Sequence, residues 1–166
     1  MDKNMFQSCL KTLRCIRKTF DESEHPRDEK GRWCGNYTAT DASGRKYSFV
    51  PDRVYRDSET FVPVVVDVDK VDASFAKDGT GMSGNYIPPG GEGKRGCRAG
   101  FERWVDTPSQ EPIAMSVLGL KVHSDREIQF LNGRHRFSVL RDRGVKTMPV
   151  MTFRDGAEEF RRRFGV

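Results

Sequence analysis

The pattern of apolar and polar residues predicts strands and helices over the last two thirds of the chain. The run Phe61–Val68 is almost continuous in β-branched residues, which is typical of a strand buried on both faces. Residues 113–122 and 127–131 are two shorter apolar runs around a polar turn, so we expect them to pair as a hairpin. A last strand is predicted to begin at residues 148–151.

A helix is predicted just before the last strand. Phe137 and Leu140 give it an apolar face, and residues 141–143, which are Arg, Asp and Arg, are expected to face solvent. Gly144 stands where a glycine commonly ends a helix. Residues 132–133 are Asn-Gly and are predicted to form the turn before this helix, because glycine adopts backbone angles that are closed to other residues.

The first sixty residues are predicted to form a separate part of the chain. Residues 1–20 repeat apolar side chains at helical spacing with basic residues between them, and the segment from 20 to 33 is a charged linker. A β-hairpin is expected over residues 37–50. The basic helix either docks on the protein's own core or engages a membrane, a nucleic acid or a partner. We therefore predict a division into residues 1–60 and a domain over residues 61–166.

A glycine-rich stretch interrupts the domain at residues 78–96. Its seven glycines and two prolines in nineteen residues exclude a regular packed element. Gly79, Gly81 and Gly84 match a dinucleotide-binding spacing, but no strand precedes them and no helix follows, so that interpretation fails. Long loops of this kind are either functional lids or spacers. Short helices are expected at residues 97–106 and 156–164.

Composition and charge narrow the picture further. A chain of 166 residues is long enough for one domain with a core. Its formal charge is +5, and residues 134–166 hold nine Lys or Arg against four Asp or Glu, an excess as large as the total. Such a field attracts nucleic acid or polyphosphate, although a basic surface also serves solubility alone. No apolar run suits a signal peptide or a membrane span, and no Cys-x-x-Cys pair is present, so we expect a protein of the bacterial cytoplasm without structural zinc.

The turn and first helical turn at residues 132–136 predict a phosphate site. Asn132 and Gly133 form the turn, and Arg134, His135 and Arg136 follow where backbone N–H groups and the helix dipole already favour an anion. Arg134 and Arg136 would hold phosphate oxygens, while His135 would orient or protonate an oxygen, which makes His135 and Arg136 the catalytic candidates. The alternative is structural: Arg136 bonds backbone carbonyls and His135 caps the turn.

Two further groups are candidates for the same site. Lys94 and Arg95 end the glycine-rich stretch and would close over an anionic ligand if it is a lid. Asp67 and Asp69 lie two residues apart, hence on one side of an extended chain, and paired carboxylates hold magnesium beside phosphates. The alternative is that these carboxylates only end the strand in solvent.

These residues also carry a family resemblance. The segment 132–137 with the helix after it, and then 144–150, resembles the Gly-x-(His/Arg)-Arg box, helix and Ile-Pro-Val strand of the ParB/sulfiredoxin-like superfamily. Upstream, Pro112-Ile113 before a strand fits the same pattern, so the resemblance spans residues 64–152 with a gap. It implies an α+β fold, a small mixed sheet with helices, preceded here by the N-terminal helix and hairpin. Sulfiredoxins have their catalytic cysteine where this chain has Arg134, so sulfinic acid repair is not expected.

The resemblance implies binding of ATP or another NTP, with Mg²⁺ as a candidate cofactor. In size the chain is most similar to small plasmid fertility-inhibition proteins of this fold, which implies NTP hydrolysis or DNA cleavage and a role in inhibiting or regulating DNA transfer. The segment 25–33 is similar to one that recurs in tailed-phage head and morphogenesis proteins, which indicates a phage or mobile-element origin. The alternative is a non-enzymatic effector that binds and inhibits a host or phage protein.

Overall fold

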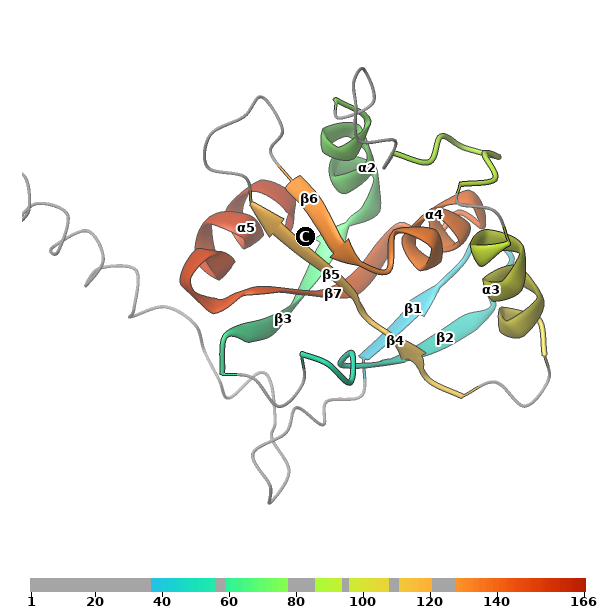
Figure 1. The fold of residues 1–166 in the computed structure, drawn as a ribbon, viewed down its shortest axis with the longest axis horizontal. Coiled ribbons are helices and arrows are strands. Elements are labelled where there is room, and N and C mark those ends of the chain that lie inside the picture. The colour runs from blue at the N-terminus through green and yellow to red at the C-terminus, as the bar shows by residue number, and fades with distance from the viewer. Residues whose placement is uncertain (1–36, 56–58, 78–85, 94–95, 108–110, 121–127) are drawn as a thin grey trace, which may run out of the picture.

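The computed structural model describes residues 37–55, 59–77, 86–93, 96–107, 111–120 and 128–166 (Figure 1). The predicted helix at residues 1–20 and the charged linker lie outside these ranges. No helix in the described ranges is long and apolar enough to cross a membrane.

The described chain forms seven strands and several short helices. The strands are β1 (Tyr37–Thr40), β2 (Lys46–Val50), β3 (Phe61–Asp67), β4 (Ile113–Ala114), β5 (Ser116–Leu120), β6 (Ile128–Asn132) and β7 (Thr147–Phe153). The helices are α2 (Val68–Ala76), α3 (Cys97–Val105), α4 (Arg134–Asp142) and α5 (Ala157–Phe164), with a 3₁₀ turn, η3 (Arg154–Gly156), before α5. The predicted α+β class is therefore confirmed.

The strands form two mixed sheets. One has the order β1-β2-β4, and the other has the order β3-β7-β5-β6. Both β3 and β6 are antiparallel to their neighbours, whereas β5 runs parallel to β7. The segment from β4 to β5 passes from one sheet into the other, and the Met115 N–H between them donates to the Val50 carbonyl over 2.8 Å. The two sheets are thus joined by one continuous piece of chain.

The strongest predicted strand lies at the edge of the larger sheet. β3 pairs with β7 along its whole length, from Phe61 opposite Phe153 to Asp67 opposite Thr147. Every residue from Phe61 to Val66 is buried except Val65, which is 37% exposed. Burial on both faces is therefore confirmed for most of the strand, and Val65 is the exception.

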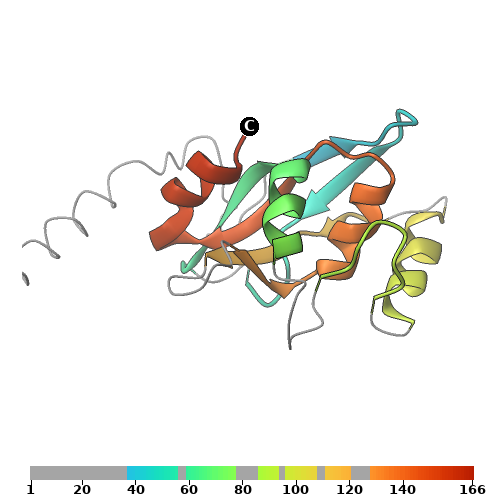
Figure 2. The same cartoon turned by 90° about the horizontal axis from the view of Figure 1, so that it is seen from above.

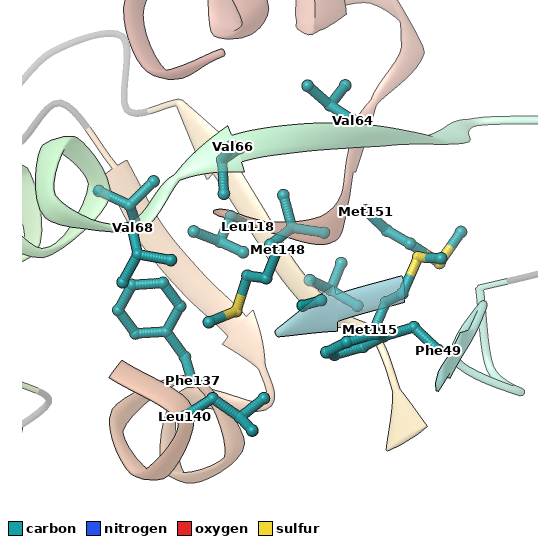
Figure 3. Packing of buried hydrophobic residues seen from close by; sticks show 14 of the residues in the cluster. Phe49, Val64, Val66, Val68, Met115, Leu118, Phe137, Leu140, Met148 and Met151 are labelled. Atoms are coloured by element: carbon teal, nitrogen blue, oxygen red, sulfur yellow. The ribbon is translucent and has the colours of Figure 1, made fainter. Parts of the chain in front are cut away.

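One cluster of buried side chains fills the space between the sheets and helices. Phe137 and Leu140 of α4 point toward Leu118 and Met148 of the larger sheet (Figure 3). Side chains of the predicted hairpin, among them Tyr47, belong to the same cluster. The hairpin and the residues after 60 therefore share a core. Figure 2 shows α3 and α5 at opposite ends of the folded part.

The hairpin turn docks on the end of α4. Gly144 has φ +79, and a Cβ atom on it would lie only 2.7 Å from Cβ of Ala42. The Ala42 N–H donates to the Arg143 carbonyl over 3.1 Å. The predicted glycine cap is confirmed, and the close approach of the hairpin adds a second requirement for glycine that the sequence does not show.

Candidate functional site

The predicted phosphate turn begins at a glycine that no other residue can replace without strain. Gly133 has φ +82, and its carbonyl accepts the first intrahelical hydrogen bond of α4, from the Phe137 N–H over 3.0 Å. A Cβ atom here would lie 2.7 Å from Oγ of Ser116 and 2.8 Å from Nη2 of Arg136. The Ser116 hydroxyl also donates to the Gly133 carbonyl over 3.0 Å. The turn is therefore packed against the start of β5.

The structure brings five of the predicted site residues together. Asn132 ends β6, Gly133 is the N-cap of α4, and Arg134, His135 and Arg136 make up the first turn of the helix. Among the described residues, no side-chain hydrogen bond caps the helix at Gly133. All three side chains of the first turn are half-buried. A helix start with three basic or protonatable side chains and no acidic one suits an anion.

Asp52 is a member of this site that the sequence does not reveal. Its Oδ2 accepts hydrogen bonds from Nδ2 of Asn132 over 3.0 Å and from Nη2 of Arg136 over 3.2 Å. Its Oδ1 accepts the N–H of Val54 over 3.1 Å. Asp52 follows β2, and 80 residues separate it from Asn132, so no local pattern connects the two. Only the docking of the smaller sheet places the carboxylate here.

Arg136 makes the backbone contact that was its structural alternative, together with an ion pair that the sequence does not predict. Its Nη2 bonds the Asp52 carboxylate and, more weakly at 3.4 Å, the Met115 carbonyl. The side chain is 19% exposed. The backbone contact was the structural alternative for this residue, so Arg136 stabilises the turn in any case. A role in binding phosphate must therefore coexist with a structural one.

A loop from the glycine-rich stretch lies against His135. A Cβ atom on Gly93 would lie 2.8 Å from Cε1 and 2.9 Å from Nδ1 of this histidine. Ile87, at the start of the loop, is buried, so residues 86–93 pack on the protein although they form no helix or strand. Lys94 and Arg95, predicted to cover the ligand, lie outside the described residues.

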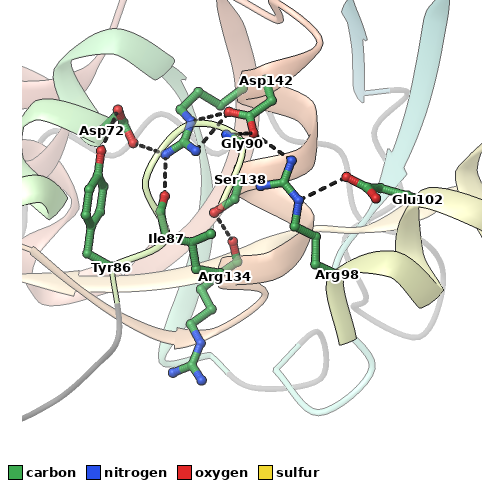
Figure 4. Close-up of polar contacts among 10 residues, drawn as sticks. Asp72, Tyr86, Ile87, Gly90, Arg98, Glu102, Arg134, Ser138 and Asp142 are labelled. Carbon is green, nitrogen blue, oxygen red and sulfur yellow. Dashed lines mark hydrogen bonds and ion pairs between the residues drawn. The ribbon is translucent and has the colours of Figure 1, made fainter. Parts of the chain in front are cut away.

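A polar network behind the site holds this loop to α4 (Figure 4). The Asp142 carboxylate accepts the Gly90 N–H over 2.9 Å and Nη2 of Arg98 over 2.6 Å. Nη1 of Arg141 donates to the Ile87 carbonyl over 2.8 Å and to the Asp72 carboxylate. Arg134 points away from this network (Figure 4). The site residues lie at the N-terminal end of α4, whereas the anchoring residues Arg141 and Asp142 lie at its C-terminal end.

The expectation that residues 141–143 form the solvent-facing side of the helix is wrong for Arg141 and holds only in part for the other two, since Asp142 is exposed and Arg143 is half-buried. The Arg141 side chain is only 7% exposed, and its guanidinium also lies 2.8 Å from Oδ1 of Asp142. Arg143 is 23% exposed and bonds Asp106 beyond α3. These residues are polar and lie outside the apolar repeat, so the sequence predicts that they face solvent. In the structure α2, α3 and the loop at residues 86–93, which are distant in sequence, contact them.

The network sets the charge states of its members. Burial would raise the pKa of the Asp142 carboxyl, but the Gly90 N–H and the guanidinium groups of Arg141 and Arg98 outweigh it and lower that pKa. Burial opposes the charged form of Arg98 as well, yet its bonds to Asp142 and Glu102 raise its pKa. The shifts of Asp142 and Arg98 both favour the charged forms, so charged hydrogen bonds fix the loop.

The two predicted metal ligands lie elsewhere. Asp67 is the N-cap of α2 and accepts the Lys70 N–H over 3.0 Å, while Asp69 bonds Nζ of Lys146 over 3.0 Å. The expectation of an extended chain is wrong here, because α2 begins at Val68. Lys146 follows the C-terminal end of α4, whereas the phosphate turn is at its N-terminal end. The described residues contain no group of three or more His, Cys, Asp or Glu that would hold a metal ion.

Comparisons with known proteins bear on the fold. No model of a protein family matches the chain, and no curated protein matches it. One solved structure is similar: the oncogenic suppression activity protein, a plasmid fertility inhibition factor, as its gold(I) cyanide derivative. The TM-score is 0.58 at 16% sequence identity, over 93% of this chain and 85% of that chain. The resemblance to the ParB/sulfiredoxin-like superfamily stays a prediction, and the chain shares the fold of a plasmid fertility inhibition factor.

Proposed function

We propose that the turn at Gly133–Arg136 binds the phosphates of a nucleotide or a nucleic acid. We further propose that the protein belongs to a plasmid or phage and inhibits or regulates DNA transfer, with NTP hydrolysis or DNA cleavage as its activity. The similar structure is named a plasmid fertility inhibition factor, and that name supports the biological role proposed here.

The start of α4 carries the proposal. Gly133 bends the chain with φ +82, so that Arg134, His135 and Arg136 all fall within the first helical turn. The first N–H groups of any helix have no acceptor within that helix, and the dipole adds positive potential at this end. We propose that a phosphate bound at this end of the helix takes its side-chain donors from among Arg134, His135 and Arg136.

Titration calorimetry tests the binding directly. ATP, CTP, GTP and a short single-stranded DNA are titrated into the wild type and the Arg134→Ala variant. Arg103→Ala is the matched control, because it removes the same charge from an exposed position on another helix, α3. Losing one charge-assisted hydrogen bond to phosphate weakens binding about tenfold or more. The control is expected to stay within about twofold.

The proposal has two outcomes that contradict it. A folded wild type that binds none of the three nucleotides and no DNA excludes the site. Equal weakening by Arg134→Ala and Arg103→Ala shows a diffuse electrostatic effect of the basic surface instead of a specific turn.

Catalysis is a separate question for the same protein. His135→Gln keeps a polar side chain but removes proton transfer, so we expect turnover of the bound nucleotide, or nicking of DNA, to fall about a hundredfold or more while the dissociation constant changes little.

The magnesium role predicted for Asp67 and Asp69 is tested by Asp69→Asn in titrations with and without Mg²⁺. If the pair holds the ion, this variant loses the effect of Mg²⁺ on binding.

A second candidate function is a non-enzymatic effector that binds a host or phage protein. The bond between Arg136 and Asp52 favours this second function, because it gives Arg136 a structural role that needs no ligand. In that case Arg134→Ala leaves inhibition of DNA transfer intact in a conjugation assay, although the protein has no measurable turnover.

A further inference from the structure

We propose that Asp52 is a positioning residue of the phosphate site, which holds the Arg136 guanidinium and the Asn132–Gly133 turn in the geometry that binds an anion. This inference rests on the proposed function and names a residue outside the sequence box that the site requires. Asp52 would not touch the ligand. It would act through Arg136 and Asn132.

The hydrogen bonds of Asp52 reach both sides of the glycine turn. Oδ2 accepts from Nδ2 of Asn132, the residue before Gly133, and from Nη2 of Arg136, three residues after it. Oδ1 of Asn132 in turn accepts the Gly133 N–H over 2.8 Å. One carboxylate oxygen therefore fixes the orientation of the Asn132 amide, and through it the Gly133 N–H, together with the guanidinium of Arg136.

The carboxylate is itself held firmly. The Asp52 side chain is 8% exposed, and its second oxygen accepts the Val54 N–H over 3.1 Å. The Tyr55 N–H donates to the Asp52 carbonyl over 3.0 Å, which closes a turn around the residue. A covered carboxylate is stable only when its oxygens are bonded and its charge is opposed, and here both conditions are met. A group fixed in this way can impose its geometry on its neighbours.

Asp52 leaves part of Arg136 available for a ligand. The hydrogen bonds of the Arg136 side chain within the described part of the chain both involve Nη2, to Asp52 and to the Met115 carbonyl. A guanidinium has five N–H donors in a rigid fork, so fixing Nη2 sets the direction of Nη1 and Nε as well. Pre-organised donors of this kind bind phosphate with less loss of side-chain entropy than free ones.

The negative charge of Asp52 allows a positioning role to be distinguished from a simple electrostatic effect. A carboxylate beside an anion site opposes the anion, so simple electrostatics predicts that Asp52→Asn, which removes one negative charge, tightens binding. Positioning predicts the opposite, because the neutral amide holds Arg136 less firmly and presents a donor as well as an acceptor. The two explanations therefore differ in direction and not only in size.

The experiment is a titration of ATP and of inorganic tripolyphosphate into the wild type and Asp52→Asn. Asp106→Asn is the matched control, since Asp106 also accepts hydrogen bonds from two side chains, those of Arg45 and Arg143, and its replacement changes the charge equally. We expect Asp52→Asn to weaken binding about tenfold and Asp106→Asn to leave it within about twofold. In an Arg136→Lys background, Asp52→Asn is expected to cost much less, because the two act as a unit.

Thermal unfolding establishes that each variant is folded. If Asp52→Asn does not fold, Asn132→Ala replaces it: Asn132 is exposed, the charge is unchanged, and binding is expected to weaken severalfold. Unchanged or tighter binding by the folded Asp52→Asn variant, or by Asn132→Ala where that replaces it, overturns the positioning role and leaves the phosphate site standing. A wild type that binds neither ATP, CTP, GTP, tripolyphosphate nor single-stranded DNA overturns the proposed function and this inference with it.

Discussion

Gly93 lies directly against the imidazole ring of His135, so closely that a Cβ atom on Gly93 would approach Cε1 of the histidine to 2.8 Å. The same atom would lie 2.7 Å from Cδ1 of the buried Ile87. Both distances are below normal carbon contacts. The loop at residues 86–93 and the first turn of α4 therefore form one packed unit, and the position of the loop depends on a residue without a side chain.

Gly93→Ala is expected to displace the loop from His135. The methyl group meets two neighbours and the backbone is at φ +65, so we expect a loss of stability of about 2–4 kcal/mol. Gly90→Ala is the matched control, because Gly90 has φ +72 but nothing within 4 Å of the added atom. Strain in φ alone costs about 1–2 kcal/mol. Urea denaturation measures both, and equal losses would show that the contact with His135 is unimportant.

Arg141→Met is expected to destabilise the protein strongly. The substitution keeps an unbranched side chain but leaves the Asp72 carboxylate and the Ile87 carbonyl without the Arg141 guanidinium. Breaking a covered ion pair from one side typically costs about 3–5 kcal/mol. Arg162→Met is the control, since that side chain is 68% exposed in its pair with Glu159 and exposed pairs contribute little. A similar midpoint for both variants in urea would contradict a structural role of the network.

The local parts of the fold were predictable because they depend on neighbours in sequence. Gly133 and Gly144 each carry a turn signal beside an apolar repeat, and both have the expected positive φ. The pairing of β5 with β6 follows from two apolar runs around a polar turn. Such signals need only backbone preferences and side-chain spacing, which the sequence displays directly.

The contacts that support the site were not predictable. Asp52 meets Arg136 across 84 residues, and Arg141 meets Asp72 across 69, so each pair exists only after the sheets and helices have docked. A polar residue on a helix is predicted to face solvent from the sequence alone. Arg141 does not, because the loop at residues 86–93 covers it. The placement of Asp67 and Asp69 on one side of an extended chain failed for a local reason, because α2 begins at Val68, between them.

Asp41 is expected to make the hairpin sensitive to acid. Burial would raise the pKa of its carboxyl, but hydrogen bonds from the Ser43 and Tyr47 hydroxyls and from the N–H groups of Arg45 and Ser43 lower it to about 2. Because the folded pKa lies below the ordinary value of 3.8, this stabilisation is complete above about pH 4 and is lost as the pH falls toward 2. The melting temperature of Asp41→Asn should therefore fall less steeply over this range.

Tyr47→Phe provides the control for that interpretation. It removes the 2.6 Å bond from the Tyr47 hydroxyl to Oδ2 of Asp41 and leaves the carboxylate charge in place. The Asp41 pKa should rise toward its ordinary value, as carboxyl carbon NMR measures. An acid transition of the same steepness in wild type and Asp41→Asn would show that other carboxylates, such as Glu159 with its pKa of about 2, dominate.

Gly144→Ala tests whether the hairpin and α4 depend on each other. Both Gly144 and Gly44 have positive φ, +79 and +86, so alanine strains the backbone at either position by about 1–2 kcal/mol. At Gly44 the methyl group meets nothing within 4 Å, whereas at Gly144 it would lie 2.7 Å from Cβ of Ala42. The extra crowding adds about 1–3 kcal/mol, unless the hairpin moves away from Arg143. Hydrogen exchange distinguishes these cases: faster exchange of the Ala42 N–H in Gly144→Ala, but not in Gly44→Ala, shows that the hairpin has separated. Equal stability of the two variants would mean that the hairpin turn adjusts freely and that its docking on α4 contributes little to folding.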